Sequence, residues 1–253
     1  MEAVSLRGLA KSYGAKRAVD GLDLDVPVGS FFGLVGPNGA GKSTTLRMAT
    51  GLLRPDAGTA TVCGIDVWAD PLTAKAQIGV LTEDLRLFDR LSAEELLSYN
   101  GLLRSMDRAV IKQRSAELLD VLGLENERGN FVIDFSQGMR KKIALACALL
   151  HAPKVLFLDE PFESVDPISS RTIRTVLEHY TAGGGTVVFS SHVMETVERL
   201  CDHVGIIHAG RLVAEGPTKK LLRGKRLEDV FFRVVGATAE DDAALSWLGT
   251  SPR

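Results

Sequence analysis

The clearest chemical signal in the sequence occupies positions 36 to 44, which read GPNGAGKST. Three glycines fall within six residues and are followed by a lysine and two hydroxyl side chains, in the pattern G-x-x-x-x-G-K-[ST]. The amides of such a loop converge on phosphate oxygens, the lysine reaches the β- and γ-phosphates, and the serine hydroxyl ligates Mg²⁺. We therefore predict that a nucleoside triphosphate is bound by Gly36, Pro37, Asn38, Gly39, Ala40, Gly41, Lys42, Ser43 and Thr44.

A pair of carboxylates ends the apolar run VLFLDE. Its apolar residues place Asp159 at the end of a buried strand, where the carboxylate can hold Mg²⁺ indirectly or through water. Side chains alternate along a strand, so Glu160 is expected to point elsewhere and to polarise an attacking water. An isolated pair of this kind would more often be two solvated acids. Its place downstream of a phosphate-binding loop favours the catalytic interpretation.

A third candidate is the stretch FSQGMRKK. Ser136 and Gly138 lie at the predicted start of a helix, where free backbone amides bind anions. A helix-capping serine would explain Ser136 equally well if the other motifs were missing. The adjacent basic run, Arg140 to Lys142, is expected on a solvated helix face.

These residues must be positioned by the strands and helices of an α/β fold. Two strand-like segments, VSLRGLA and LDLDVP, precede the buried strand SFFGLVG and the helix KSTTLRMATGLL. Two short strands are expected around Gly64, and residues from about 88 to 150 are mostly helical, with a capping box from Ser92 to Glu95. The α/β pattern resumes with the strands KVLFLDEP and GGGTVVFSSH, the helices SRTIRTVLEHY and ETVERLCD, and the hairpin HVGIIHAGRLVAEG.

Composition and charge argue against several classes of protein. A formal net charge of −2 over 253 residues gives no support to general nucleic-acid binding. The widely separated Cys63, Cys147 and Cys201 suggest neither a disulfide framework nor a zinc site, and Cys147 is expected in the core. The first residues lack the apolar centre of a signal peptide, and no stretch approaches the roughly 18–20 apolar residues of a membrane helix. We expect a soluble chain, with any membrane part supplied by a separate chain.

Taken together, the motifs resemble those of the nucleotide-binding subunit of ATP-binding cassette (ABC) transporters, from Tyr13 to about Val235. GPNGAGKST corresponds to the Walker A motif of that family, and VLFLDEP to its Walker B motif with the catalytic glutamate at Glu160. SQGMRKK stands where the signature motif stands, and ESVDP resembles the D-loop with Asp166. His192, at the end of TVVFSSH, matches the switch histidine. Tyr13 in KSYG matches the aromatic residue that stacks on adenine.

The resemblance implies a P-loop NTPase with a RecA-like core, an antiparallel β subdomain and a helical subdomain inserted at about residues 88–150. The ATPase domain would span residues 1–235, followed by a loosely ordered tail at 236–253. Two subunits would stack head to tail around two ATP molecules with Mg²⁺. Each ATP would lie between the Walker A motif of one chain and Ser136, Gln137 and Gly138 of the other.

The resemblance also implies partners and a location. The partners would be a membrane-spanning transporter subunit and a second ATPase subunit, either an identical copy or a paralogue, with no nucleic acid. The chain would act at the cytoplasmic face of the cell membrane as a peripheral subunit. ATP binding would close the dimer, and hydrolysis with product release would open it.

Two motifs depart from the family pattern. The usual signature LSGGQ reads FSQGM, in which Gln137 replaces a glycine and Met139 replaces the glutamine. The lid glutamine is Glu83 in QIGVLTEDL, and its carboxylate can ligate Mg²⁺ or water but cannot donate as an amide does. Together with the ending LEDVFFRVVGA, these departures resemble a branch of bacterial exporters with a separate membrane subunit, which handle drugs, antibiotics, ions or glycans.

Two alternatives were weighed against an exporter ATPase. A soluble ABC-type ATPase acting on ribosomes or DNA would carry the same motifs, but such relatives usually have two cassettes per chain or a long coiled-coil insertion. A P-loop GTPase or small-molecule kinase would leave the signature, D-loop and switch histidine unexplained, and the sequence has no NKxD motif. The favoured interpretation is the ATP-hydrolysing subunit that powers an ABC-type exporter, with the substrate chosen by the membrane subunit.

Overall fold

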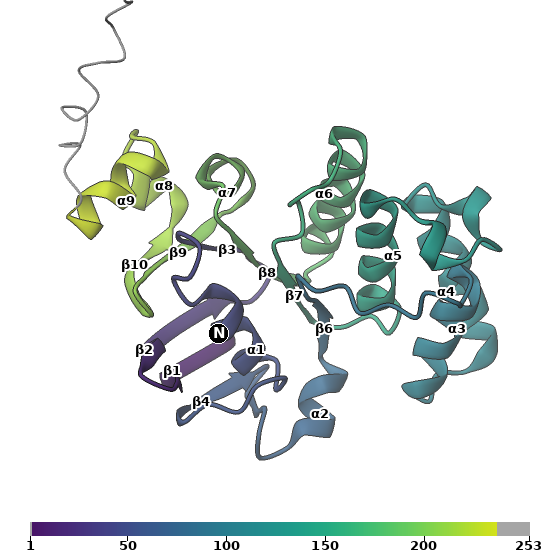
Figure 1. Ribbon diagram of the computed structural model, residues 1–253, viewed down its shortest axis with the longest axis horizontal. Helices are drawn as coiled ribbons and strands as arrows, with labels where there is room; N and C mark the ends of the chain where they lie inside the picture. The colour runs from purple at the N-terminus through teal and green to yellow at the C-terminus, as the bar shows by residue number, and fades with distance from the viewer. Residues whose placement is uncertain (1, 237–253) are drawn as a thin grey trace, which may run out of the picture.

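The computed structural model describes residues 2–236, and Figure 1 shows their arrangement. Two sheets form the framework of this part of the chain. One is four-stranded with the order β2-β1-β4-β5, and the other is six-stranded with the order β10-β9-β3-β8-β7-β6. The predicted α/β class is confirmed. The expected tail at 236–253 lies outside the described residues except for Gly236, which ends the last helix.

The four-stranded sheet is antiparallel throughout. The long strands β1 (Glu2–Tyr13) and β2 (Lys16–Pro27) form a hairpin, and β1 also pairs with β4 (Ala57–Val62). The short β5 (Ile65–Asp66) completes the sheet next to β4. The two short strands expected around Gly64 are therefore confirmed.

The six-stranded sheet is parallel except at one edge, where β10 runs antiparallel to β9. The central strands β3, β7 and β8 are buried along their whole length, as expected for parallel strands with both faces covered. The predicted hairpin of the last two strands is confirmed. The strands of this sheet are β3 (Phe31–Val35), β6 (Ile78–Leu81), β7 (Val155–Asp159), β8 (Thr186–Ser191), β9 (His203–His208) and β10 (Arg211–Pro217).

The helices differ in which end of the molecule they cover. Figure 1 shows α3, α4 and α5 together at one end, and α8 and α9 beside β10 at the other. The expected capping box is confirmed at Ser92, whose hydroxyl accepts from the amide of Glu95 while the Glu95 carboxylate accepts from the amide of Ser92. The helices are α1 (Lys42–Ala49), α2 (Pro71–Ala76), α3 (Ala93–Leu103), α4 (Arg108–Val121), α5 (Gln137–Leu149), α6 (Pro167–Ala182), α7 (Met194–Leu200), α8 (Thr218–Leu222) and α9 (Leu227–Val235).

The central sheet separates two hydrophobic cores. Phe31 packs into the core shared with the helices after residue 90, whereas the next residue, Phe32, packs into the core shared with the antiparallel sheet and α1. Leu158 and Phe157 of β7 alternate in the same way. This double burial fixes the ends of the parallel strands, where the predicted loop and carboxylates lie.

Two expectations about burial were wrong. Lys141 and Lys142 were expected on a solvated helix face, but only 6% and 9% of their surfaces are exposed. They face inward because α5 is packed among α3, α4 and α6, and both ammonium groups find backbone carbonyls as partners. Cys147 was expected in the core, but it is half-buried and packs against the core from the edge of a groove.

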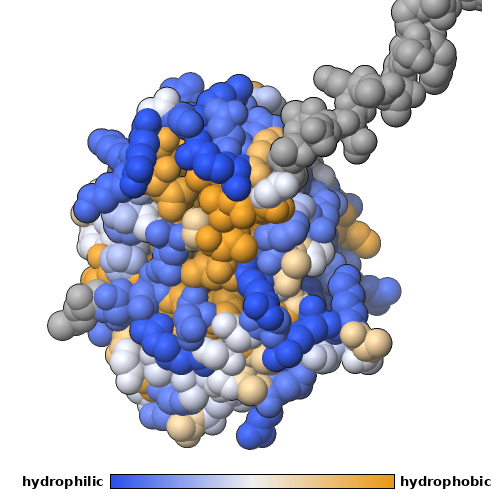
Figure 2. All heavy atoms as spheres, turned by 90° about the vertical axis from the view of Figure 1, so that its left-hand side faces the viewer, coloured by the Kyte–Doolittle hydropathy of each residue, from blue (hydrophilic) through white to orange (hydrophobic). Residues whose placement is uncertain are grey.

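The face formed by β10, α8 and α9 carries an apolar patch, visible at the centre of Figure 2. Phe232 and Val234 of α9 are exposed, and Leu221, Leu222 and Val213 nearby are half-buried. Among residues 2–236, none of the helices combines the length and the apolar composition needed to span a bilayer.

Candidate functional site

The loop of residues 36–41 connects the end of β3 to the start of α1 and is pressed closely against its neighbours. A Cβ atom on Gly36 would collide with the carbonyl oxygen of Ile207 in β9. Gly41 has a φ of 110°, and a Cβ there would lie 2.5 Å from the carbonyl oxygen of Ala18 in β2. Glycine is therefore required at both positions for a physical reason, the close approach of backbone to backbone.

The tip of the β9–β10 hairpin supports this loop from outside. The amide of Gly210 donates to the carbonyl of Ala40 at 2.9 Å, and the amide of Asp20 donates to the carbonyl of Gly210 at 2.9 Å. The hairpin turn thus ties the loop to β2. Sequence analysis identified the turn at Gly210 but gave no sign that it contacts the loop.

Lys42 lies at the centre of the loop and is 5% exposed. Its Nζ donates to the carbonyl oxygens of Gly36 at 2.8 Å and Pro37 at 3.3 Å, and lies 3.5 Å from Glu160 Oε1. A buried ammonium needs such partners, because an unpaired buried charge is strongly unfavourable. The loop therefore holds a positive charge at the point where phosphate oxygens are expected.

Asp159 is held between two hydroxyl groups at the end of β7. Its Oδ1 accepts from Ser43 Oγ at 3.0 Å and from Ser190 Oγ at 2.6 Å, and the residue is 4% exposed. Ser190 Oγ in turn accepts from the amide of Glu160 at 3.0 Å. The pairing of Ser43 with Asp159 brings together two of the predicted Mg²⁺ ligands. Ser190 was not predicted, although a polar residue near the end of the apolar run TVVFSS is the signal that could have found it.

Glu160 follows β7 in a left-handed conformation, with a φ of 47°. Non-glycine residues rarely adopt this region. Strand alternation was expected to direct the Glu160 side chain. Strand β7 ends at Asp159, however, so the sharp turn at Glu160 directs the side chain instead. Its Oε1 lies 3.1 Å from Nδ1 of His192 and 3.5 Å from Nζ of Lys42. The carboxylate is 8% exposed, whereas the His192 side chain is 35% exposed.

Most of the predicted residues line one pocket of about 340 Å³. The aromatic ring expected to stack on adenine, Tyr13, is 51% exposed at the end of β1 and is available for stacking. Lys16 and Glu163 also line the pocket and were not predicted, although each follows a predicted residue by three positions. The pocket is lined by Tyr13, Lys16, Ala18, Asn38, Gly39, Gly41, Lys42, Ser43, Thr44, Glu83, Glu160, Glu163 and His192.

Glu83 joins this pocket to a neighbouring one of about 320 Å³, and Glu163 and Gln137 also line the neighbour. Partial burial raises the pKa of Glu83, and the negative charges of Asp159, Glu163 and Glu160 raise it further. Three of the four carboxylates gathered here thus belong to predicted site residues. Gln137 lines this second pocket but not the pocket that contains Lys42 and Glu160.

Ser136, Gly138 and Asp166 do not line the pocket of their own chain. Ser136 caps α5 by accepting from the amide of Met139 at 3.2 Å, and Asp166 caps α6 by accepting from the amides of Ile168 and Ser169. A Cβ on Gly138 would lie 2.6 Å from Ser169 Oγ and 2.7 Å from Asp166 Oδ2. These three residues form a separate cluster where the starts of α5 and α6 meet.

The donor groups in the pocket fit a magnesium nucleoside triphosphate. The loop glycines leave no side chain between the backbone and a phosphate, and Lys42 supplies the positive charge. Ser43 and Asp159 are hydroxyl and carboxylate oxygens, the hard ligands that Mg²⁺ prefers. Within the described part of the chain no cluster of three or more His, Cys, Asp or Glu residues forms a ready metal site. That suits Mg²⁺, which commonly takes one or two carboxylates and completes its shell with phosphates and water.

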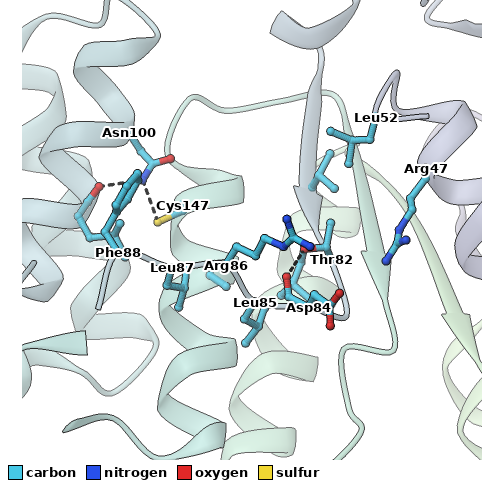
Figure 3. A pocket seen from close by; sticks show the side chains of 14 residues that line it. Arg47, Leu52, Thr82, Asp84, Leu85, Arg86, Leu87, Phe88, Asn100 and Cys147 are labelled. Carbon is cyan, nitrogen blue, oxygen red and sulfur yellow. Dashed lines mark hydrogen bonds between the residues drawn. The ribbon is translucent and has the colours of Figure 1, made fainter. Parts of the chain in front are cut away.

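A larger groove of about 470 Å³ lies beside the nucleotide pocket, and Figure 3 shows it from close by. Arg47 and Leu52, at and after the end of α1, form one side, and Phe88, Asn100 and Cys147 form the other. Residues 84–88, which directly follow Thr82 and Glu83, cross the groove. Leu52 and Phe88 are 55% and 53% exposed, so the groove offers apolar side chains to solvent.

Comparisons with known proteins agree with this geometry. The family model for ABC transporters matches residues 19–163. The chain is 40% identical over 219 residues to the daunorubicin/doxorubicin resistance ATP-binding protein DrrA of Streptomyces peucetius, in a match that covers 87% of this chain and 66% of that protein. It is 38% identical over 219 residues to the Nod factor export ATP-binding protein I of Cupriavidus metallidurans, covering 87% of this chain and 72% of that protein.

Solved structures show the same fold. An ATP-binding subunit of an ABC transporter superposes with a TM-score of 0.85 at 29% sequence identity, covering 92% of this chain and 99% of that one. The expected P-loop NTPase fold with an antiparallel β subdomain is therefore confirmed.

Proposed function

The chain belongs to the ABC transporter family of ATP-binding subunits, and from this premise we propose that it hydrolyses ATP to power an exporter. The observation that carries the proposal is the meeting of Lys42, Ser43, Glu160 and His192 in one pocket, with Asp159 bonded to Ser43 beneath it. Each group is of the type that phosphoryl transfer to water requires. Lys42 and His192 each lie within 3.5 Å of the Glu160 carboxylate, and Ser43 is bonded to Asp159.

We assign roles to these residues from their contacts. The Lys42 ammonium, now held by two carbonyls, would pair with the β- and γ-phosphates, and Ser43 and Asp159 would hold Mg²⁺. Glu160 is placed to orient the attacking water. His192, 3.1 Å from Glu160, is placed to hold that carboxylate and contact the γ-phosphate. The exposed ring of Tyr13 would stack on the adenine base.

The cluster at the starts of α5 and α6 supports a two-subunit site. Ser136 is exposed at a helix N-terminus, a geometry suited to binding phosphate, yet it lies outside its own chain's nucleotide pocket. We propose that Ser136, Gln137 and Gly138 contact ATP held by a second subunit in a head-to-tail dimer. Asp166 would lie at that interface. ATP would then favour the closed dimer through contacts that exist only when it is closed.

The membrane partner would dock in the groove of Figure 3. The groove combines exposed apolar side chains, Leu52 and Phe88, with the charged Arg47, Asp84 and Arg86. It is crossed by the segment that begins next to Glu83, so an occupant could influence the nucleotide pocket through Glu83. The names of the relatives, a drug-resistance protein and a Nod factor export protein, support an exporter over a ribosomal or DNA-directed ATPase.

Substitution of Glu160 by glutamine tests the proposal. Glu160→Gln keeps the size and position of the side chain but removes the base, so we expect turnover to fall by roughly 10²-fold or more. ATP binding persists, and the variant accumulates as an ATP-bound dimer. Phosphate release, ATP affinity and size-exclusion chromatography with and without ATP measure the three properties.

Glu178→Gln is the matched control, because Glu178 is a carboxylate on α6 that is 55% exposed and lies outside the pocket. We expect it to hydrolyse ATP at the wild-type rate. Wild-type turnover by Glu160→Gln would show that the role given to Glu160 is wrong. If the adjacent reading frame encodes a protein with several hydrophobic segments, reconstitution with that protein and transport assays would then identify the substrate.

A further inference from the structure

We propose that Lys141 is a positioning residue for hydrolysis, which links the helix bearing Ser136 to the backbone of Glu160 in the same chain. The proposal rests on the ATPase function proposed above and gives a role to a residue that was expected only on a solvated helix face. Its basis is one buried contact. The Lys141 ammonium donates to the carbonyl oxygen of Glu160 at 2.5 Å.

The contact is specific to Lys141 among the two buried lysines of α5. Lys141 and Lys142 are adjacent and almost equally buried, at 6% and 9% exposed. The Lys142 ammonium points instead to the carbonyl of Gly123 after α4, at the longer distance of 3.4 Å. The two neighbouring lysines therefore contact different elements, and only Lys141 reaches Glu160 at the end of β7.

Lys141 completes the restraint on the peptide groups that flank Glu160. The Glu160 backbone is left-handed, with a φ of 47°, a conformation that persists only where surrounding contacts enforce it. On the N-terminal side, the Glu160 amide donates to Ser190 Oγ at 3.0 Å. On the C-terminal side, the carbonyl accepts from Lys141. Because both groups are held, the Glu160 carboxylate is aimed at His192 and Lys42.

Charge supports the same role. Lys141 faces four carboxylates, Glu163, Glu160, Glu83 and Asp159. Burial lowers the pKa of Lys141, and these carboxylates oppose that change. A buried cation at this place offsets the repulsion among the carboxylates and holds them close to one another.

The position of Lys141 on α5 gives the contact its consequence. Ser136 caps α5, and Lys141 lies five positions later on the same helix. Since a helix moves as a rigid element, a displacement of its N-terminus by a second subunit also displaces the Lys141 ammonium. The Glu160 carbonyl follows, so engagement of Ser136 by one subunit's ATP adjusts the water-orienting carboxylate of the other site.

The experiment compares Lys141→Met and Lys141→Arg with the control Lys142→Met, using ATP turnover over a range of ATP concentrations. We expect Lys141→Met to lower kcat by roughly tenfold or more while KM for ATP changes by less than about threefold. Lys141→Arg restores most of kcat, because it returns a buried donor to the same carbonyl. Lys142→Met loses less than about half of kcat.

A double variant separates positioning from folding. In the Glu160→Gln background the carboxylate no longer acts, so adding Lys141→Met should leave ATP-dependent dimer formation as it is in the single Glu160→Gln variant. The melting curve shows whether Lys141→Met folds. If it does not, kcat is compared between Lys141→Arg and Lys141→Gln. Equal kcat in these two variants overturns the proposal. Wild-type kcat in Lys141→Met also overturns it. If the wild-type protein itself did not hydrolyse ATP, that result would instead contradict the proposed function.

Discussion

At the scale of single residues, Ser190 organises the two carboxylates on which the proposed chemistry depends. Its hydroxyl donates to Asp159 and accepts from the Glu160 amide, so one oxygen orients both the carboxylate proposed to bind Mg²⁺ and the residue proposed to orient water. Ser190 is fully buried, and solvent cannot replace its hydroxyl. The residue is therefore as important to the geometry as the motif residues that it contacts.

We expect Ser190→Ala to lower both stability and turnover. The variant leaves the buried Glu160 amide without a partner and removes one of the two donors to Asp159 Oδ1, which costs about 1–3 kcal/mol of unfolding free energy. Turnover falls more than ATP affinity, because the change acts on Asp159 and Glu160 and not on the phosphate loop. Ser191→Ala is the control, since the Ser191 hydroxyl accepts from the amide of Val193 and touches neither carboxylate. Equal turnover in the two variants would contradict this role for Ser190.

The sequence alone located the residues that act through fixed spacing within one segment. Lys42 and Ser43 follow the loop glycines directly, and Asp159 and Glu160 follow an apolar run that could only be a buried strand. Ser190 and Lys141 escaped detection because their partners are 31 and 19 positions away in the chain. Contacts of that kind depend on which strands are neighbours, and hydrophobic periodicity carries no such information.

At the scale of elements, the junction between α5 and β6 contains a partly buried imidazole. His151, just beyond α5, has its Nε2 3.0 Å from the carbonyl oxygen of Ile78 in β6, and its Nδ1 has no partner among the described residues. In the neutral form, Nε2–H donates to that carbonyl. The pKa of His151 is lowered from 6.5 to about 4, first by burial and then by the nearby positive charge of Arg104. The junction therefore depends on an uncharged histidine.

This shift predicts a loss of stability at mildly acidic pH. Between pH 6.5 and 4 the unfolded chain binds a proton at His151 and the folded chain does not, so the free energy of unfolding decreases as the pH falls through this range. Below about pH 4 the contribution levels off because both states are protonated. We expect His151→Gln, which keeps a side-chain donor but cannot titrate, to reduce this slope in urea unfolding curves measured at several pH values. An unchanged slope would show that other groups are responsible.

The elements themselves were largely predictable, and their ends were not. Capping residues and apolar periodicity identified the helices after residue 90 and the buried strands, because these signals are local. The left-handed turn at Glu160 could not be read from the sequence, since glutamate has no preference for that conformation and tertiary contacts impose it. The burial of Lys141 and Lys142 was missed for a related reason. A basic run is normally solvated unless backbone carbonyls from other elements are within reach.

At the scale of the whole molecule, the separation between the nucleotide pocket and the Ser136 cluster is what the proposed two-subunit site requires, because each chain would then supply half of it. The sequence supplied both motifs, and the resemblance supplied the expectation that they meet across a dimer. The structure adds that Ser136 and Gly138 lie outside the pocket of their own chain. It also shows that Gly138 is required for contact between α5 and α6, because a side chain there would collide with Ser169 and Asp166.

Mixing two inactive variants tests this division. Lys42→Ala removes the phosphate-binding cation but keeps Ser136, and Ser136→Glu places a negative charge where phosphate is expected but keeps the pocket. Glutamate is compatible with a helix N-terminus, so α5 should stay folded. Each variant alone is expected to hydrolyse ATP very slowly, and their mixture to recover part of the wild-type turnover at the one intact composite site. No recovery in a mixture that forms dimers would contradict a site shared between subunits.

The support of the phosphate loop by the tip of the β9–β10 hairpin has a consequence for the order in which the protein matures. Gly36 and Ala40 are synthesised well before their neighbours Ile207 and Gly210. A nascent chain that has emerged only as far as α7 contains every residue proposed to contact ATP, yet it lacks the backbone that shapes the loop. Such long-range contacts form late and slowly. We therefore expect nucleotide affinity to appear only once the β9–β10 hairpin has packed against the loop.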